Sequence, residues 1–450
     1  MEKDDRILME ALKKFEKWTP TSKRMFEEAK NYIAGGVTGD VKFFEPYPVL
    51  MRKAHGSKIE DVDGNSYVDL LCAYGAIILG HGNTITRSAM KLVEERVGTS
   101  LFGTPSPYEA EFAKLLTESQ RFDGSVRFSN SGTEATVLAV RLAKAATGRK
   151  AIAKFEGHYH GSNDRLLVSH RPPLSAAGKA DSPRSVADSS DVDETALSET
   201  VVLPFNDTES TASLLEENAD RLACVIMEPF EEGVIEARNG FMRKVRKLTA
   251  DCGIPLIFDE VKTGFRVGLR SAAGYYNITP DIICLGKTIG GGFPIGAVMG
   301  NHHIMDQLGK NHNGRAFFHS GTFSGNPLSM IAGMKTVEYL MQHDNFRKIE
   351  EKTSKLRSGI TRELESHGLE HTAEGRGTMF NYYLGSETVN CYRDVIKSNQ
   401  KLRRILDLLL LTEGVYNKPL NRYSMMLSHE DDDITEVVGA MSRVLDVLQS

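Results

Sequence analysis

The chain has 450 residues, a formal net charge of −5 at pH 7, and 40% hydrophobic and 26% charged residues. This composition is typical of a soluble globular protein and argues against a general nucleic-acid binder. No apolar run is long enough to cross a membrane, and 450 residues exceed one ordinary core, so we expect at least two subdomains.

The N-terminal sequence MEKDDRILMEALKKF is charged from its second residue. It therefore lacks the apolar region of a signal peptide, and its acids disfavour a transit peptide. The five cysteines form no CxxC pair, which favours reduced thiols over disulfides or a metal site. These cysteines are Cys72, Cys224, Cys252, Cys284 and Cys391. Together these features predict a cytoplasmic protein.

The hydrophobic pattern changes along the chain. Residues 1–34 indicate amphipathic helix, and residues 41–80 indicate short strands and turns with a hairpin signal at Asp63-Gly64. From about 105 to 335, apolar strands alternate with helices, which predicts an α/β fold with a mostly parallel sheet. From about 336, amphipathic helices mix with short strands, as in a second, smaller domain.

The segment from Arg171 to Thr200 differs from its surroundings. It is rich in Ser, Asp, Ala and Pro and has almost no large apolar residues. Such a segment cannot pack a core, which predicts a mobile loop. A disordered insertion without a role and an active-site lid remain open as alternatives.

The run VRFSNSGTEATVLAVRLAKAATGR has the pattern of a strand followed by the start of a helix. Ser131 to Glu134 fits an S-x-x-E capping box. Ser131, Gly132 and Thr133 then place backbone N–H groups and hydroxyls at a helix N-terminus, which suits a phosphate. The signal is weak alone, because many helices begin this way with nothing bound.

Three predicted buried strands each end in a polar side chain. CVIMEP ends near Glu228, IPLIFDEV carries Asp259, and DIICLGK ends at Lys287, with spacings of 31 and 28 residues that fit strand–helix–strand units. Ligands bind beyond the carboxyl ends of strands in such sheets, so the three side chains should converge. A buried lysine is either an ion-pair partner or a nucleophile held as a Schiff base. A purely structural ion-pair network is the competing interpretation.

The chain resembles the class III, fold-type I pyridoxal-phosphate (PLP) aminotransferases. The features that carry the resemblance are, in chain order, the phosphate cup formed by Ser131, Gly132 and Thr133, the strand-end Asp259 and the strand-end Lys287. The resemblance is strongest to the branch of glutamate-1-semialdehyde 2,1-aminomutase and covers residues of about 30 to 440. The matching segments are SNSGTEA, FEGHYHG, FDEVKTGFR, GYYNITPDIICLGKTIGGGFPIGA and SGTFSGNPLSMIAG.

The resemblance implies a role for each matching residue. Lys287 would form the internal aldimine with the cofactor, Asp259 would face the pyridine nitrogen, and Val261 and Tyr159 would cover the two ring faces. A carboxylate beside that nitrogen keeps it protonated, which the electron sink requires. Glu228 would lie near Asp259 and the ring.

Further implied roles concern the phosphate and the assembly. Ser131, Gly132 and Thr133 would hold the phosphate, and Thr322 would reach it from the neighbouring subunit of a homodimer whose active site lies at the interface. The resemblance implies fold-type I architecture, with an N-terminal segment of the small domain over 1–75, a large PLP-binding domain over 76–335 and a C-terminal small domain over 336–450.

Two other chemistries fit less well. Gly286-Lys287-Thr288 resembles the end of a P-loop, but the required glycine five residues earlier is Asp281. His158 and His160 suggest a metal pair, but no third ligand lies nearby, so a loop beside the cofactor is favoured.

The resemblance implies an amino-group transfer in which neutral Lys287 shuttles a proton, with pyridoxamine 5'-phosphate as the intermediate cofactor form. The predicted function is an aminotransferase for an amino acid or amine donor and a keto or aldehyde acceptor, with β-amino acids among the substrates. The alternatives are glutamate-1-semialdehyde 2,1-aminomutase, which moves the amino group within one molecule, and a ligand-binding protein without chemistry.

Two departures from the aminomutase pattern favour the aminotransferase at this stage. The arginine that holds the substrate carboxylate is replaced by Lys42, and a late glutamate by Asn421. Arg422 matches a carboxylate-binding arginine of β-amino-acid aminotransferases. Lys42 and Arg422 are therefore the candidate substrate-binding residues, with a solvated surface position as the alternative for each.

Overall fold

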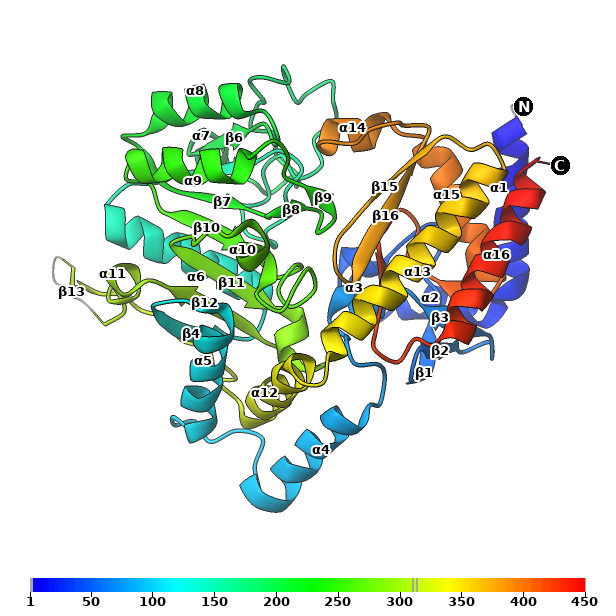
Figure 1. Cartoon of the computed structure of the whole chain (residues 1–450), viewed down its shortest axis with the longest axis horizontal. Coiled ribbons are helices and arrows are strands. Elements are labelled where there is room, and N and C mark those ends of the chain that lie inside the picture. Colours follow the sequence, from blue (N-terminus) through cyan, green and yellow to red (C-terminus); the bar gives the residue numbers. More distant parts are fainter. Residues whose placement is uncertain (1–2, 310, 313–314, 450) are drawn as a thin grey trace.

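The computed structural model describes residues 3–309, 311–312 and 315–449. A seven-stranded sheet in the order β4-β12-β11-β10-β7-β5-β6 forms its centre (Figure 1). Neighbouring strands pair in parallel except β12, which is antiparallel to β11 and β4. In sheet order, the strands span Ser125–Ser129, Gly296–Gly300, Ile282–Gly286, Leu256–Asp259, Leu222–Met227, Ala151–Phe155 and Thr200–Leu203. The predicted α/β fold with a mostly parallel sheet is confirmed.

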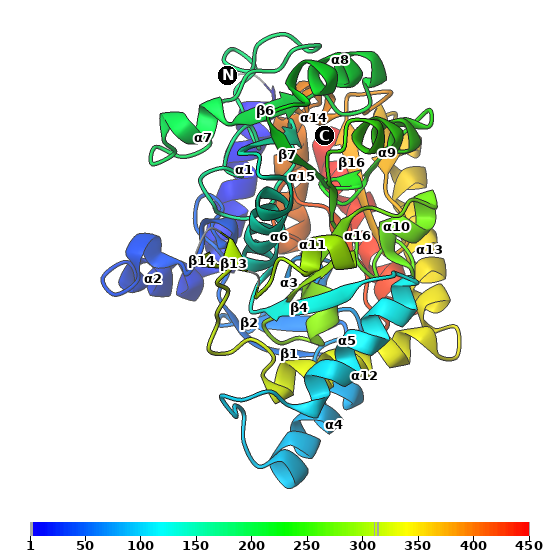
Figure 2. The same cartoon turned by 90° about the vertical axis from the view of Figure 1, so that its left-hand side faces the viewer.

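Helices cover the sheet, which explains why its central strands are continuously apolar rather than alternating. Helix α6 (Gly132–Thr147) packs against β11, β12 and β7, and buries Leu138 and Leu142 there. Helix α4 (Thr84–Leu92) extends from the body of the molecule in both ribbon views (Figures 1 and 2). The other helices of this part are α5 (Pro107–Gln120), α7 (Glu194–Ser198), α8 (Thr208–Asn218), α9 (Phe241–Asp251), α10 (Ser271–Tyr276), α11 (His302–Met305) and α12 (Pro327–Met341).

The two ends of the chain build a second part together. Strand β17 pairs in parallel with β3 of the N-terminal sheet, and helix α1 packs on α15 (Figure 1). The sheet β1-β2-β3-β17 comprises Met51–His55, Lys58–Asp61, Ser66–Asp69 and Val415–Tyr416, and the sheet β15-β16-β18 comprises His371–Glu374, Met379–Leu384 and Tyr423–Ser424. The helices are α1 (Lys3–Trp18), α2 (Pro20–Ala29), α13 (Asn345–Ser366), α14 (Tyr392–Lys397), α15 (Gln400–Thr412) and α16 (Asp431–Gln449).

Short elements connect these parts. They are α3 (Cys72–Gly75), the helical turns η1 (Ala34–Gly36), η2 (Asp40–Lys42), η3 (Val93–Val97) and η4 (Lys287–Gly290), and the hairpin strands β8 (Phe230–Glu231), β9 (Ile235–Glu236), β13 (Asn311–His312) and β14 (Arg315–Ala316). The hairpin predicted at Asp63-Gly64 is confirmed between β2 and β3. Within the described ranges, no helix has the length and apolarity needed to cross a membrane.

The N-terminal region predicted as amphipathic helix forms two helices. Helix α1 ends at Trp18, and α2 begins at Pro20. Proline has no N–H to continue the hydrogen-bond ladder and disfavours helical backbone in the residue before it. Thr19 accordingly leaves the helical region, with φ −127° and ψ 48°, and Pro20 takes the first position of α2, where its ring is tolerated.

The segment predicted as a mobile loop is held by helix α14. Arg393 of α14 forms a bidentate pair with Glu156, at 2.6 and 2.9 Å, and also donates to the carbonyl oxygens of Ala177 and Gly178. The Tyr392 hydroxyl donates to the carbonyl oxygen of Pro172 at 2.9 Å. The segment is thus irregular but hydrogen-bonded across the two parts of the molecule.

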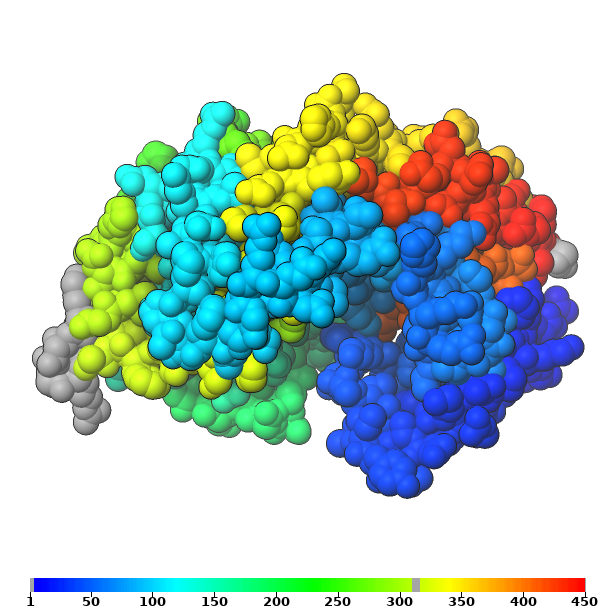
Figure 3. Space-filling model, turned by 90° about the horizontal axis from the view of Figure 1, so that it is seen from below, coloured from blue at the N-terminus to red at the C-terminus, as the bar shows by residue number. Residues whose placement is uncertain are grey.

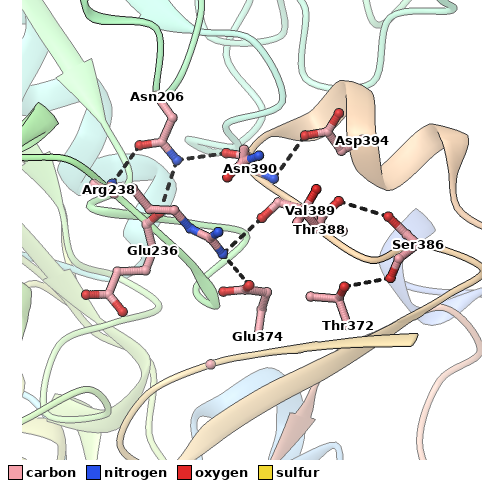
Figure 4. Close-up of polar contacts among 12 residues, drawn as sticks. Asn206, Glu236, Arg238, Thr372, Glu374, Ser386, Thr388, Val389, Asn390 and Asp394 are labelled. Atoms are coloured by element: carbon pink, nitrogen blue, oxygen red, sulfur yellow. Dashed lines mark hydrogen bonds and ion pairs between the residues drawn. The ribbon is translucent and has the colours of Figure 1, made fainter. Parts of the chain in front are cut away.

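A second polar network joins the two parts near β9 (Figure 4). Asn206 accepts from the N–H of Arg238 at 2.8 Å and donates to the carbonyl oxygen of Asn390 at 2.8 Å. The Arg238 guanidinium pairs with Glu374 of β15 and donates to the carbonyl oxygen of Val389 at 3.2 Å. These contacts hold β15 and the residues before α14 beside the large sheet. The candidate site lies between these two parts of the molecule.

Candidate active site

A cavity of about 980 Å³ opens between the two parts of the molecule, beyond the carboxyl ends of the parallel strands. Figure 3 shows the molecule hollowed where the blue N-terminal segment faces the green part of the chain. The predicted site residues in its wall are Ser131, Gly132, Thr133, Tyr159, Asp259, Val261, Lys287 and Arg422. The convergence predicted from strand ends on Asp259 and Lys287 is therefore present.

Lys287 begins the turn η4 directly after β11, with a left-handed φ of 47°. Such a backbone conformation costs free energy in a non-glycine residue, and it is common at functional sites. Burial lowers the pKa of Lys287 to about 7, and the charges of Arg422 and Lys262 contribute in the same direction. Within the described residues, its amine makes no hydrogen bond or ion pair, so a structural ion-pair role does not account for it.

This environment predicts an unusually reactive amine. In the cofactor-free protein, we expect the acetylation of Lys287 to reach half of its maximal rate near pH 7, as measured by competitive labelling and mass spectrometry. An ordinary lysine has a pKa of 10.5. Exposed Lys42 is the internal reference. Arg422→Ala removes a nearby positive charge and should raise the midpoint pH, because the ammonium form then meets less repulsion. A midpoint at ordinary lysine pH would contradict the assignment.

Asp259 is fixed by two contacts at the end of β10. Its Oδ2 lies 2.7 Å from Nδ1 of His160, and its Oδ1 accepts the N–H of Val261 at 3.1 Å. Asp259 and His160 are both buried. His160 lies in irregular backbone, where the sequence predicted a loop beside the cofactor, and its ring orients the aspartate. Among the described residues, no group of three or more His, Cys, Asp or Glu side chains could hold a metal ion.

Tyr159 and Glu228 are coupled behind the cavity wall. The N–H of Tyr159 donates to Oε2 of Glu228 at 2.9 Å, and Oε1 of Glu228 lies 2.7 Å from Nζ of Lys262. The Tyr159 ring lies against His170, with centroids 4.9 Å apart. Glu228 itself is not part of the cavity wall, so it acts on the site through Tyr159 and Lys262.

The predicted phosphate cup is the N-terminus of α6. Ser131 Oγ accepts the N–H of Glu134 at 3.1 Å, while the reciprocal bond of the predicted capping box goes to the N–H of Asn130 instead of Ser131. The first N–H groups of a helix have no partner within it. A Cβ at Gly132 would come within 2.6 Å of the Val261 side chain, so glycine lets the cup approach Val261 closely.

Arg422 lies in the wall of the cavity, on the segment before β18. Its Nη2 donates to the carbonyl oxygen of Tyr74 at 3.1 Å, and its buried Nε has no partner. No ion pair of its guanidinium occurs among the described residues. Arg422 is half-buried, and a partly desolvated cation without a counter-charge favours an anion as its partner.

The remaining two predicted residues lie outside the cavity wall. Lys42 is exposed, and its amine donates to Oγ1 of Thr38 at 2.7 Å, although its neighbours Val41 and Phe43 line the cavity. Thr322 is exposed on the turn before α12. Their roles in substrate binding and in the neighbouring subunit's site stay predictions.

Two residues had no predicted role. Lys262 lines the cavity, and buried Arg266 donates to the carbonyl oxygens of Gly75, Ile77 and Met425. His160 was predicted only to lie beside the cofactor, and it also holds Asp259. Burial lowers the pKa of Arg266 to about 10. The run FDEVKTGFR places two basic residues directly after a buried strand, which was the available signal.

These side chains fit pyridoxal phosphate. A free amine at Lys287 matches an aldehyde, the fixed carboxylate of Asp259 matches a pyridine nitrogen, and the N-terminus of α6 matches a phosphate. The fold and site therefore define a pyridoxal-phosphate enzyme of the α/β, fold-type I class.

Comparison with known proteins narrows this class. The family profile Aminotransferase class-III matches residues 43–445. The chain is 38% identical to glutamate-1-semialdehyde 2,1-aminomutase of Bacillus subtilis (strain 168), over 94% of this chain and 97% of the relative. Its structure resembles an omega-transaminase from Sphaerobacter thermophilus (TM-score 0.89, 31% identity, 95% and 98% of the two chains) and a beta-phenylalanine aminotransferase from Variovorax paradoxus (TM-score 0.86, 27% identity, 99% and 98%).

The chain belongs to the class III aminotransferases, a family of pyridoxal-phosphate enzymes. The predictions of this family, its cofactor and its enzymatic nature are confirmed. The comparisons favour the aminomutase alternative over the intermolecular aminotransferase that the sequence reasoning preferred, because identity is higher to the aminomutases.

Proposed function

We propose that this enzyme is a glutamate-1-semialdehyde 2,1-aminomutase, which moves an amino group within one substrate molecule. The similarity to curated aminomutases supports the intramolecular reaction. The observation that carries the substrate class is the half-buried guanidinium of Arg422, which forms no ion pair among the described residues and shares a cavity with Lys287. Glutamate 1-semialdehyde has one carboxylate to supply that charge.

The residues of the chain divide the work. When bound, pyridoxal phosphate supplies the electron sink that stabilises negative charge on the carbon bearing the amino group. Asp259, held by His160, would face the pyridine nitrogen of the bound cofactor and would keep it protonated. Lys287 is substantially neutral at pH 7. Its amine can therefore accept a proton from the substrate carbon that bears the amino group and return it to a neighbouring carbon. Arg422 fixes the carboxylate and hence the orientation of the substrate.

A second candidate, an aminotransferase with separate donor and acceptor, is supported by Asn421. This residue lines the cavity where the aminomutase pattern has a glutamate, and its Oδ1 accepts the N–H of Arg422 at 2.8 Å. The cavity therefore has an amide rather than a carboxylate at that position.

The two candidates differ in their need for an acceptor. We expect the enzyme to convert glutamate 1-semialdehyde to 5-aminolevulinate in successive turnovers without a second carbonyl compound, followed by chromatography. The control is a donor screen with α-, β- and ω-amino acids, in which absorbance reports stoichiometric conversion of the cofactor. Turnover that stops after one equivalent until a keto acid is added would instead establish the aminotransferase.

Arg422→Ala should weaken carboxylate substrates. Loss of a desolvated charge pair costs about 2–5 kcal/mol, which corresponds to roughly 30-fold or more in affinity. We expect KM to rise by that order while kcat changes less, since the reacting atoms lie elsewhere. Steady-state kinetics with Lys247→Ala, at an exposed lysine of α9, as the matched cationic control tests this, and an unchanged KM in Arg422→Ala would exclude the contact.

We also propose a homodimer in which Thr322 reaches the phosphate site of the neighbouring subunit. The support is the turn that carries it, where Thr322 and Phe323 are exposed and Phe323 keeps 61% of its surface accessible. Exposed aromatic residues beside a site are typical of subunit interfaces. Light scattering should give twice the mass of one chain, and a monomeric active enzyme would contradict the arrangement.

A further inference from the structure

A second lysine, Lys262, stands in the cavity and has no part in the chemistry described above. It follows Val261 in the loop after β10, and its side chain is only 13% exposed. Its Nζ lies 2.7 Å from Oε1 of Glu228 and 5.6 Å from the centre of the Tyr159 ring. Lysine is rarely buried without a partner or a chemical role. Lys262 has a partner in Glu228, but it also lines the cavity, which suggests a role there.

Glu228 balances the charge of Lys262 without using all of its hydrogen-bond donors. Both carboxylate oxygens are engaged, one by Lys262 and the other by the N–H of Tyr159 at 2.9 Å, and the side chain is 2% exposed. An ammonium group has three N–H donors. Contact with Glu228 uses one of them, which leaves Lys262 with donors for a group in the cavity that it lines.

Arg422 provides the contrast. Lys262 and Arg422 approach each other on either side of Gly233, where an added Cβ would lie 3.4 Å from Cβ of Lys262 and 3.6 Å from Nε of Arg422. Arg422 has no ion pair among the described residues, whereas Lys262 is neutralised by Glu228. An unpaired cation favours an anion, and a neutralised pair favours an uncharged acceptor, because a second carboxylate would also be repelled by Glu228.

We propose that Lys262 is a specificity-determining residue that donates a hydrogen bond to a neutral carbonyl oxygen of the substrate whose carboxylate is bound by Arg422. This orientation rests on the proposed function, since it requires a substrate with one carboxylate and one uncharged carbonyl group. The site then selects such semialdehyde-like molecules over dicarboxylates of the same length. Arg422 and Lys262 both lower the pKa of Lys287, which places both cations close to the reactive amine.

Calorimetry on the cofactor-loaded enzyme with three unreactive probes tests the assignment. Pentanoate offers one carboxylate, 5-amino-5-oxopentanoate adds a neutral carbonyl, and glutarate adds a second carboxylate. A hydrogen bond to a charged donor is worth roughly tenfold in affinity or more. We expect the amide probe to bind at least about tenfold more tightly than pentanoate, and more tightly than glutarate. Lys262→Met should abolish the advantage over pentanoate, and Lys247→Met, which changes an exposed lysine of α9 outside the cavity wall, should preserve it.

Removal of Lys262 leaves Glu228 buried without its cation, which can destabilise the fold. The double variant Lys262→Met/Glu228→Gln removes both charges and is measured in parallel, with cofactor absorbance and thermal melting as checks of folding. Equal binding of pentanoate and the amide probe in the wild type would overturn the proposal. So would an advantage that survives in the double variant, or tighter binding of glutarate than of the amide.

The probes undergo no reaction, so the outcome is separate from the aminomutase assignment. Failure of single-substrate turnover with an intact, Lys262-dependent amide preference would reject the proposed function and retain the carbonyl contact. Successful turnover without that preference would retain the function and reject the role of Lys262.

Discussion

Lys287→Ala is expected to abolish turnover, with a loss of roughly 10³-fold or more. The variant loses both the amine that attaches the cofactor and the base that moves the proton. No second lysine can replace it, because Lys262 is held against Glu228. The visible absorbance of the lysine-bound cofactor should also disappear, since the other described lysines of the cavity wall, Lys262 and Lys418, are held by Glu228 and by the carbonyl oxygen of Val41. Kinetics and an absorbance spectrum of the same preparation measure the two losses.

Chemical rescue separates this role from a structural one. Lys287→Ala leaves space at the end of a cavity of about 980 Å³, so a small primary amine such as methylamine can enter. Partial recovery of turnover with added amine, increasing with pH as the amine loses its proton, would support the assignment. Lys247→Ala is the matched control and should keep full activity, because Lys247 is exposed on α9 and pairs with Asp251 outside the cavity wall. Full activity of Lys287→Ala without added amine would exclude the role.

The sheet and the side chains around the cofactor site could be predicted from the local sequence pattern. Strands β7, β10 and β11 are mainly apolar runs of four to six residues. Glu228 and Lys287 directly follow β7 and β11, and Asp259 is the last residue of β10. Parallel strands with crossover helices bring their carboxyl ends to one edge, so position along a strand was enough to predict convergence. The N-terminus of α6 was predictable for the same reason, because Ser131 is a strong capping residue.

The substrate side of the cavity could not be derived in this way. Arg422 and Lys418 come from irregular backbone near β18, and their positions depend on how the small part packs against the large one. Contacts such as Arg266 with Gly75 and Met425 are separated by more than 150 residues and have no local pattern. Lys42 stands at the position of the carboxylate-binding arginine of the aminomutase pattern, but its amine contacts Thr38. Lys262 had no predicted role, yet it lines the cavity.

Asp259→Asn is the second change with a large expected effect. The amide cannot supply the negative charge that keeps the pyridine nitrogen protonated, so the cofactor loses its electron sink. Loss of such a fixed electrostatic group costs roughly 10²–10³-fold in kcat. Asparagine is nearly isosteric with aspartate and can still accept a hydrogen bond from His160, so the fold should be retained. Steady-state kinetics and the pH dependence of the cofactor absorbance measure both consequences.

The neighbouring acid, Glu260, is the matched control for charge. Its carboxylate faces away from the cavity and accepts the N–H groups of Ala272 and Ala273, both at 2.7 Å, and burial raises its pKa to about 7. Glu260→Gln should therefore lower the melting temperature but change kcat by less than about threefold. The hydrogen bonds of Glu260 lie away from the cavity, so their loss affects stability rather than the reaction. His160→Gln keeps the charge of Asp259 but loosens its orientation, so its kcat should fall between those of the other two variants. Equal kcat for Asp259→Asn and Glu260→Gln would mean that the charge at residue 259 has no chemical role, and that β10 positions it only for folding.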